Sequence, residues 1–326
     1  MATKSYQLNI TKSDGTNETV SFTVPARSGT YKVKFTLSNG QEIDAGNITV
    51  DDTEHSYEMK FTLSDGSTIN AGTLVTPVGA PPFADASWTK IAEISEAGNA
   101  SEYFAVGDEK TIELSTGEEI TLVVLGFNHD DLTDGSGKAG MTIGMKNLLA
   151  TTYRINPSPT SANGWDGSEM RTSTMATLFS QLPSDLQSVI KQVNKKATAG
   201  RQSTSITTSA DKLWLLAMSE IFSATSIENS TMSNIKNYAD AYKAEGTQYK
   251  YYENLIGDND QKDNPLLIKK LSNGSGKAED WWWRSPYLGT NNAFYFFGKY
   301  GNCNGNSAPE THGVCFGFSC KKKGGG

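Results

Sequence analysis

The sequence predicts an α+β protein in which a small all-β repeat module precedes a larger domain of mixed helices and strands. Three observations support this prediction. The first 78 residues repeat a short alternating pattern, a stretch rich in Pro, Ala and Gly follows it, and the remainder of the chain combines helix and strand signals. With 326 residues the chain is long enough to bury a sizeable core and to form two or three domains.

The N-terminal repeat is seen in two copies, YKVKFTLSNGQEIDAG from Tyr31 and YEMKFTLSDGSTINAG from Tyr57. Ten of the twenty positions counted from each tyrosine are identical, and a diverged copy, YQLNITKSDG, begins at Tyr6. Each copy alternates apolar and polar residues, as half-buried strands do, and then reaches a Ser-Asn-Gly or Ser-Asp-Gly turn signal. We therefore expect three hairpins in residues 1–78. The module is either a plain spacer or a stalk for attachment and oligomerisation.

The segment TPVGAPPFADAS, Thr76–Ser87, cannot continue a strand ladder and predicts a semi-rigid linker. We assign residues 79–87 to this linker and residues 88–320 to the main domain. The last six residues, 321–326, are three lysines and three glycines, which predicts a flexible tail.

Four segments of the main domain carry clear signals. Residues 110–127 predict a hairpin, and 211–222 form a short, strongly apolar segment that we expect to be buried. Residues 183–197 predict the best helix of the chain, with a capping box of Ser184 and Gln187. A second helix is expected over 168–182, with its apolar residues Met170, Leu178 and Leu182 turned inward. The segments at 244–255, 256–267 and 271–280 are expected to be long surface loops.

The composition excludes several classes of partner. A net charge of −7 and 20% charged residues argue against nucleic acid and anionic membranes, which call for a basic face. No run of about 18 apolar residues is present, so no membrane insertion is expected. The N-terminus, MATKSYQLNI, lacks the apolar core of a signal peptide. We expect synthesis in the cytoplasm, followed by release in an assembled particle if the protein acts outside a cell.

Residue types that carry catalysis or bind metals are present without the spacing that such chemistry requires. The acidic loop around His129 and the segment GDNDQKDN, residues 257–264, do not match a calcium loop. No nucleophile elbow and no nucleotide fingerprint occurs. The cysteines Cys303, Cys315 and Cys320 are too few for a disulfide framework, so we expect free thiols. The prediction is therefore no enzyme activity, no metal and no cofactor.

The segment Trp281–Cys320 reads WWWRSPYLGTNNAFYFFGKYGNCNGNSAPETHGVCFGFSC and joins large aromatic side chains to asparagines. Together with six upstream blocks it resembles a domain of unknown function found in phages, prophages and Gram-positive anaerobes. The WWxRSP block and the GVxFGF ending resemble the formylglycine-generating-enzyme branch of the C-type lectin fold, which variable proteins of diversity-generating retroelements share. The upstream blocks are FAVGDEKTIEL, VLGFNHDDLTDGSGKAGMTIGMKNLLATTY, GWDGSEMRTS, LPSDLQSVIKQVNKK, DKLWLLAMSEIF and KKLSNGSGKAED.

The resemblance implies a C-type-lectin-like C-terminal domain whose last strands and loops form a binding face. From Tyr287 to Cys315 most non-glycine residues are types that randomised adenines in AAC codons encode, whereas Lys299 and Glu310 are not. Aromatic side chains with Asn and Ser also make good binding surfaces in antibodies. We expect Trp281, Trp282, Phe316 and Phe318 to fill the core, and Phe294 or Phe296 to point inward. The predicted ligand-binding residues are Trp283, Tyr287, Asn291, Asn292, Phe294, Tyr295, Phe297, Tyr300, Asn302, Asn304, Asn306 and His312.

These expectations describe a phage tail or virion-surface receptor-binding protein that binds a host-cell surface protein or glycan. The N-terminal repeats resemble short repeats of phage tail and baseplate proteins, which implies contact with other virion tail proteins and a homotrimer. Two alternatives remain open. One is an enzyme of the formylglycine-generating type, in which Cys315, Cys320 and His312 converge on a polar pocket. The other is a structural particle protein whose terminal face meets another subunit.

Overall fold

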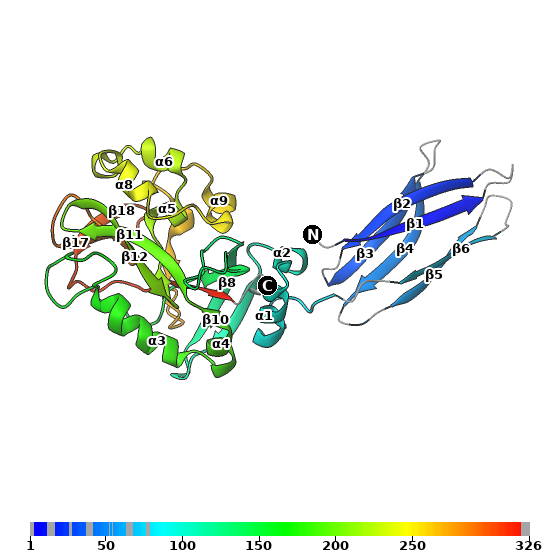
Figure 1. Ribbon diagram of the computed structural model, residues 1–326, viewed down its shortest axis with the longest axis horizontal. Coiled ribbons are helices and arrows are strands. Elements are labelled where there is room, and N and C mark those ends of the chain that lie inside the picture. The colour runs from blue at the N-terminus through cyan, green and yellow to red at the C-terminus, as the bar shows by residue number, and fades with distance from the viewer. Residues whose placement is uncertain are drawn as a thin grey trace.

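A computed structural model describes residues 3–11, 17–25, 28–36, 42–51, 53, 55–62, 68–75 and 79–320. Helices and mostly antiparallel strands are mixed, so the protein is α+β, as the sequence predicts. In Figure 1 the strands β1–β6 lie at one end of the long axis and the remaining elements at the other. Within the described residues, no helix is long and apolar enough to cross a lipid bilayer.

The N-terminal repeats form three antiparallel hairpins, as expected. The three Ser-Asn-Gly or Ser-Asp-Gly triplets lie outside the described residues. β1 lies beside β6, and β4 beside β5. The strands are β1 (Thr3–Thr11), β2 (Asn17–Pro25), β3 (Gly29–Thr36), β4 (Glu42–Val50), β5 (Ser56–Thr62) and β6 (Thr68–Val75).

A bulge recurs at the same place in the second and third hairpins. Between the pairs Val33–Gly46 and Lys34–Asp44 one extra residue, Ala45, lies on β4. The corresponding interruption of β5–β6 falls at Ala71-Gly72. The Ala-Gly dipeptide of the repeat thus marks a bulge, which bends the strand and increases its twist.

The expected linker is partly incorporated into the main domain. Phe83 is buried, with its ring 6.3 Å from Trp88 and 5.5 Å from Phe104 in edge-to-face contacts. Ala80 and Ala86 are buried with it. Treating all of residues 79–87 as a linker was therefore wrong, because the single aromatic side chain in this stretch finds an apolar pocket. Helix α1 (Trp88–Glu96) follows directly, with Ser87 as its N-cap.

The central sheet of the main domain has the strand order β10-β19-β9-β8-β7, with β13 also paired to β19. The predicted hairpin at 110–127 is confirmed as β7–β8. β19, near the end of the chain, lies inside the sheet and is buried along its whole length. The strands are β7 (Glu109–Glu113), β8 (Glu119–Phe127), β9 (Met141–Met145), β10 (Ile190–Lys191), β13 (Trp214–Leu215) and β19 (Phe316–Cys320).

The predicted helix at 183–197 is only partly correct. Helix α4 (Ser184–Val189) ends after six residues, and the chain continues as β10 and then as β11 (Val193–Gly200), which pairs with β12 (Ser203–Asp211). Pairing of Ile190 with Cys320 in the central sheet overrides the helical period. The capping box is absent, because the side chain of Gln187 donates instead to the carbonyl of Leu182 at 2.7 Å.

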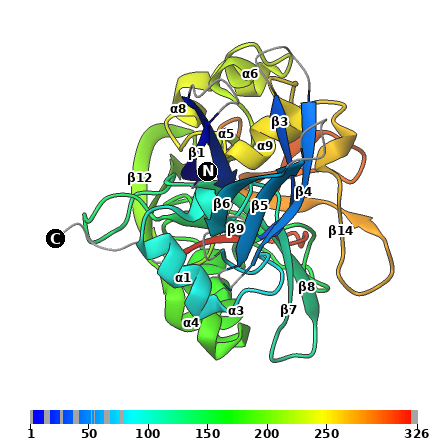
Figure 2. The same ribbon diagram turned by 90° about the vertical axis from the view of Figure 1, so that its right-hand side faces the viewer.

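The helices of the main domain form two groups on opposite sides of the strands. Helices α1, α3 and α4 lie on one side, and α5, α6, α8 and α9 lie on the other (Figures 1 and 2). The predicted helix at 168–182 is confirmed as a π-helical turn, η1 (Met170–Thr174), and α3 (Met175–Gln181), with its three apolar residues buried. The remaining helices are α2 (Ala100–Tyr103), α5 (Met218–Ile221), α6 (Ala224–Glu228), α7 (Ser233–Lys236), α8 (Ala239–Lys243), α9 (Lys250–Ile256) and η2 (Pro265–Leu267).

Two further expectations for this region have clear outcomes. Apart from the exposed Lys212, the apolar segment 211–222 is buried in the core, as predicted. The expected loop at 244–255 is wrong over its second half, which forms α9. Tyr249 and Tyr252 of this stretch are buried, and burial of two aromatic rings explains why the segment is ordered against the core.

A separate three-stranded sheet holds the aromatic segment in the order β16-β17-β18, and the short pair β14–β15 precedes it. Figure 1 shows β17 and β18 at the end of the long axis away from β1–β6. All three cysteines are free and buried, as expected for free thiols. The strands are β14 (Lys269–Lys270), β15 (Ala278–Glu279), β16 (Trp281–Pro286), β17 (Ala293–Phe297) and β18 (Cys303–Ser307).

Candidate ligand-binding face

The side of β16–β18 that faces the interior is an aromatic cluster. Trp283 stacks on Phe297 with ring centroids 6.0 Å apart, and Trp281 meets Trp283 edge-to-face at 5.9 Å. Tyr295 lies on the same side, 6.2 Å from Trp283. Phe222 of the segment after α5 closes the cluster, 5.8 Å from Trp283. These rings belong to the core.

Four aromatic residues that we expected at a binding surface are therefore inside the protein. Trp283, Phe294, Tyr295 and Phe297 are all fully buried, so their assignment to the binding surface was wrong, whereas the expectation that Phe294 or Phe296 points inward is confirmed at Phe294. The physical reason is the apolar surface that these side chains bury. Each aromatic side chain removes roughly 150–250 Å² of surface from water, and helices from elsewhere in the chain pack over the rings. The core assignment is confirmed for the other four aromatic residues, Trp281, Trp282, Phe316 and Phe318.

The opposite side of the same strands reaches the surface. Phe296 is half-buried and pairs in register with the exposed Asn304 of β18. The side-chain oxygen of Asn302 and the ring of Phe296 both lie against Gly298, which places Asn302 beside that ring. Asn306 follows Asn304 on the same side of β18, since side chains of a strand alternate.

His312 packs beneath this surface, between the rings of Phe296 and Trp282. Its ring lies 4.8 Å from Phe296, in a stacked arrangement, and 4.3 Å from Trp282. The Nδ2 of Asn306 lies 3.0 Å from Nε2 of His312. Burial lowers the pKa of His312, so the neutral ring accepts a hydrogen bond from Asn306. His312 is itself buried, which makes it a support for the surface rather than an exposed contact.

Tyr300 stands at the tip of the loop between β17 and β18, and 84% of the residue is exposed. The loop is closed by hydrogen bonds from Gly298 N–H to the carbonyl of Asn302, at 2.6 Å, and from Gly301 N–H to the carbonyl of Gly298, at 2.9 Å. The N–H of Lys299 donates to Asp280 at 2.8 Å. Tyr300 is thus presented by a short, tied loop. We call the surface formed by Phe296, Tyr300, Asn302, Asn304, Asn306 and His312 the Asn304 face.

The structure does not bring all the predicted residues to this face. Tyr287 lies on the other side of the sheet, 5.0 Å from Tyr295, and its hydroxyl accepts a hydrogen bond from Asn234 of α7. Asn291 and Asn292 precede β17, whereas Tyr300 follows it, so they lie at opposite ends of that strand. The predicted set therefore divides into separate surfaces.

Phe296 is the one residue of the Asn304 face that our predicted set omits. The sequence does contain a signal for it. In an extended WWW block Trp282 points away from Trp281 and Trp283, and Phe296 pairs with Trp282. Once Trp281 and Trp283 are assigned to one side of the sheet, alternation places Trp282 and Phe296 on the other side, where Trp282 is buried and Phe296 is half-buried.

The two polar residues of the WWWRSP block enter a buried ionic network. Arg284 donates to Glu220 at 2.5 Å and 2.9 Å, and Lys195 pairs with both Glu220 and Asp130. Burial raises the pKa of Glu220, but Arg284 and then Lys195 outweigh it, so the pKa is lowered and the carboxylate stays charged. This network joins β11, α5 and β16 and gives the aromatic sheet a rigid base.

Glu245 lies in the same network, but its pKa is shifted in the opposite direction from that of Glu220. Ser285 donates to its Oε2, and the N–H of Thr198 donates to its Oε1 at 2.9 Å. Burial raises the pKa of Glu245 to about 7. Sequence reasoning missed this network, because its acidic and basic members lie far apart along the chain.

The candidate catalytic and metal-binding groups do not converge. The thiol of Cys315 donates to the carbonyl of Met145 at 3.1 Å, and burial raises the pKa of Cys320 to about 12. Asp258 and Asp260 of the segment GDNDQKDN accept hydrogen bonds from Ser223 and Thr231, each at 2.6 Å. Across the part of the chain that is described, no group of three His, Cys, Asp or Glu side chains is arranged to hold a metal ion.

Comparison with known proteins identifies one relationship. A family model described as a domain of unknown function (DUF6273) matches residues 139–318, which is more than half of the chain. A search of curated proteins and a search of solved structures give no match. The matched region runs from β9 into β19 and includes the Asn304 face and, apart from Asp130, the ionic network. The chain belongs to the family of proteins that share this domain of unknown function.

Proposed function

We propose that the protein is a receptor-binding protein of a phage tail or virion surface, which attaches to a host-cell surface protein or glycan through the Asn304 face. The observation that carries the proposal is the position of that face. β17 and β18 lie at the end of the long axis away from β1–β6, as a receptor-binding tip lies away from its point of attachment (Figure 1). The C-type-lectin-like resemblance of the WWxRSP and GVxFGF blocks supports the same role.

The Asn304 face has the composition and rigidity of a binding surface. Phe296 and Tyr300 offer rings for stacking on a sugar or for contact with an apolar side chain. Asn302 and Asn304 are exposed and supply amides that both donate and accept hydrogen bonds. The stack of Trp282, His312 and Phe296 holds the surface in place, which lowers the entropy cost of binding.

The variability proposed from the resemblance to retroelement-diversified proteins agrees with this arrangement. Positions 300, 302 and 304 are exposed, so changing their side chains disturbs few internal contacts. Positions 294, 295 and 297 are buried, and substitutions there would disrupt the core. Diversification, where it occurs, is therefore expected at the exposed positions.

The proposal requires no catalytic step and no cofactor. A nucleophilic role for the cysteines needs thiolates, whereas burial raises the pKa of both Cys315 and Cys320. The hairpins β1–β6 are assigned to contact with other virion tail proteins and to homotrimerisation. The particle is assembled in the host cytoplasm, where the chain is made.

The test is binding of the fluorescently labelled full chain to a panel of Gram-positive anaerobic cells, measured by flow cytometry. The double variant Asn302→Ala, Asn304→Ala is expected to lose at least tenfold in affinity for the cells that bind. The matched control is Asn229→Ala, Asn237→Ala, which removes two exposed asparagines elsewhere.

Pretreatment of the cells distinguishes the two receptor classes. Periodate, which oxidises sugars, abolishes binding to a glycan, and protease abolishes binding to a protein. Equal binding by the Asn304-face variant and the control variant would rule out this face as the attachment site.

A further inference from the structure

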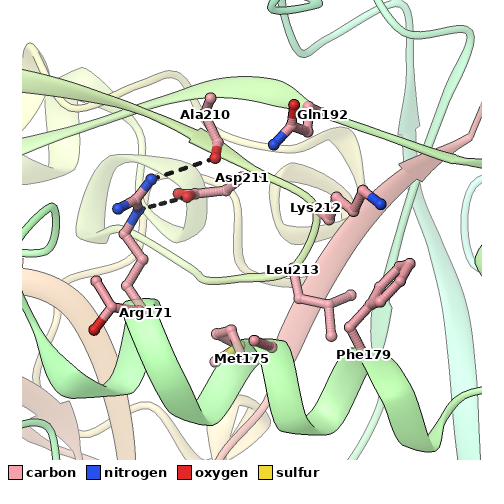
Figure 3. A pocket seen from close by; sticks show the side chains of 10 residues that line it. Arg171, Met175, Phe179, Gln192, Ala210, Asp211, Lys212 and Leu213 are labelled. Atoms are coloured by element: carbon pink, nitrogen blue, oxygen red, sulfur yellow. Dashed lines mark hydrogen bonds and ion pairs between the residues drawn. The ribbon is translucent and has the colours of Figure 1, made fainter.

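A hollow lies between helix α3 and the end of β12 (Figure 3). Its volume is about 480 Å³, within the range of roughly 300–1,000 Å³ that is usual for small-molecule sites. It shares no residue with the Asn304 face. Residues from η1 and α3 form one wall, and Gln192 with residues 210–213 forms the other.

The floor of this hollow is apolar. Met175 and Phe179 are four residues apart and therefore lie on one side of the helix, facing the β12 wall. Leu213 lies opposite them (Figure 3). Met175 and Leu213 are buried and Phe179 is half-buried, so among these three it is Phe179 that still offers apolar area for a ligand to cover.

The single acidic group of the lining is already engaged. Asp211 accepts hydrogen bonds from Nε of Arg171 at 2.6 Å, from Nε1 of Trp165 at 2.8 Å and from the hydroxyl of Ser209 at 2.8 Å. Arg171 also donates to the carbonyl of Ala210 at 3.3 Å. The pair of Arg171 and Asp211 is therefore neutral and contributes little net charge.

Lys212 is left as the cation of the pocket. Its ammonium lies 4.5 Å from the centroid of the Phe179 ring and is exposed. Among the described residues no carboxylate comes within 4.0 Å of it, unlike Lys195 and Lys243, which are both paired. Gln192 adds an exposed amide to the same rim. The pocket thus joins an apolar floor to an excess of hydrogen-bond donors.

We propose that this pocket binds a small carboxylate with an aromatic or branched aliphatic body. The body covers Met175, Phe179 and Leu213, and the carboxylate pairs with Lys212. A cationic ligand would face Lys212 without an available acid. A neutral ligand would form no ion pair with the ammonium. The carboxylate is therefore the class that satisfies both parts of the lining.

The experiment uses 3-phenylpropanoate as the probe, titrated into the full chain and followed by calorimetry and ligand-observed NMR. A fragment of this size is expected to bind with a Kd of about 1–10 mM. The neutral isostere 3-phenylpropan-1-ol and the amine 3-phenylpropylamine should bind at least fivefold more weakly. The aliphatic acid 4-methylpentanoate shows whether the site requires an aromatic ring.

The variant Lys212→Gln should weaken binding of the acid at least fivefold and leave binding of the alcohol unchanged. The matched control is Lys196→Gln, an exposed lysine of β11 outside this pocket, which should change neither. The proposal is overturned by absence of saturable binding up to about 50 mM, by equal binding of acid and alcohol, or by equal losses in the two lysine variants.

Discussion

The ring of Tyr287 lies across the backbone of Gly305, so that a Cβ at position 305 would overlap the ring atoms. Gly289 lies against the other edge of the same ring and has no room for a Cβ either. The hydroxyl of Tyr287 accepts a hydrogen bond from Asn234. Two glycines of the aromatic segment are thus explained by close packing, and Tyr287 is held between them.

Replacing Gly305 with alanine should destabilise the protein by about 1–3 kcal/mol, because the ring of Tyr287 has to move. Urea unfolding measures the loss. In a Tyr287→Ala background the same substitution should cost much less, since the overlapping ring is gone. Gly126→Ala serves as a control, because a Cβ there approaches no other atom closer than 3.9 Å. Equal costs of Gly305→Ala in both backgrounds would show that the ring is not the obstacle.

The variants Trp283→Ala and Tyr300→Ala should differ in stability, because Trp283 lies in the core and Tyr300 lies on the surface. Trp283 is fully buried between Phe222 and Phe297, so its truncation should cost about 3–5 kcal/mol. Tyr300 is exposed, and its loss should change stability by no more than about 0.5 kcal/mol. Chemical unfolding with matched m-values gives both numbers. A Trp283 variant as stable as the Tyr300 variant would contradict the aromatic core described above.

Glu245 should make the protein less stable as the pH rises. Its carboxyl has a pKa of about 7 in the folded protein, raised by burial from an ordinary value of 4.5. Below about pH 4.5 the group is protonated in both the folded and the unfolded states. Between 4.5 and 7 only the unfolded state releases the proton, so stability falls by up to about 3 kcal/mol and then levels off.

The variant Glu245→Gln removes this titration. The difference in unfolding free energy between wild type and variant should therefore change between pH 5 and pH 8, in favour of the variant at the higher pH. Titrating groups far from Glu245 affect both proteins alike and cancel in the difference. A difference that stays constant over this range would show that Glu245 ionises normally.

The proposed homotrimer is tested by light scattering after size exclusion. A single chain has a mass of 35.2 kDa, and the trimer has three times that mass. Deleting residues 1–78 should return the trimer to a monomer if the hairpins are responsible for assembly. A full chain that runs as a monomer at micromolar concentration would contradict the proposed assembly through β1–β6.

The local sequence pattern predicted correctly those elements whose stabilising contacts are between residues near each other in the chain. The repeated alternation correctly predicted three pairs of antiparallel strands, since a hairpin pairs neighbouring residues. The helix at 168–182 was found for the same reason. The helix at 183–197 failed after Val189, because Ile190 pairs with Cys320, 130 positions further along the chain.

The ionic network at the candidate site also depends on contacts between residues that are far apart in the sequence, which local patterns do not predict. Arg284, Glu220 and Lys195 come from three separate segments, and no spacing rule connects them. The polar residues of the WWWRSP block are visible in the sequence, but their partners are set by how the helices pack against β16.

The sequence by itself determined that the terminal segment forms short alternating strands rich in rings and amides, because period-two alternation is a property of the local chain. It also determined which residues share a side of each strand. Only the tertiary structure decided which side is covered. The helices and loops between residues 214 and 256 cover the side that carries Trp283, Tyr295 and Phe297, and burial of so much aromatic area outweighs any gain from leaving those rings in water.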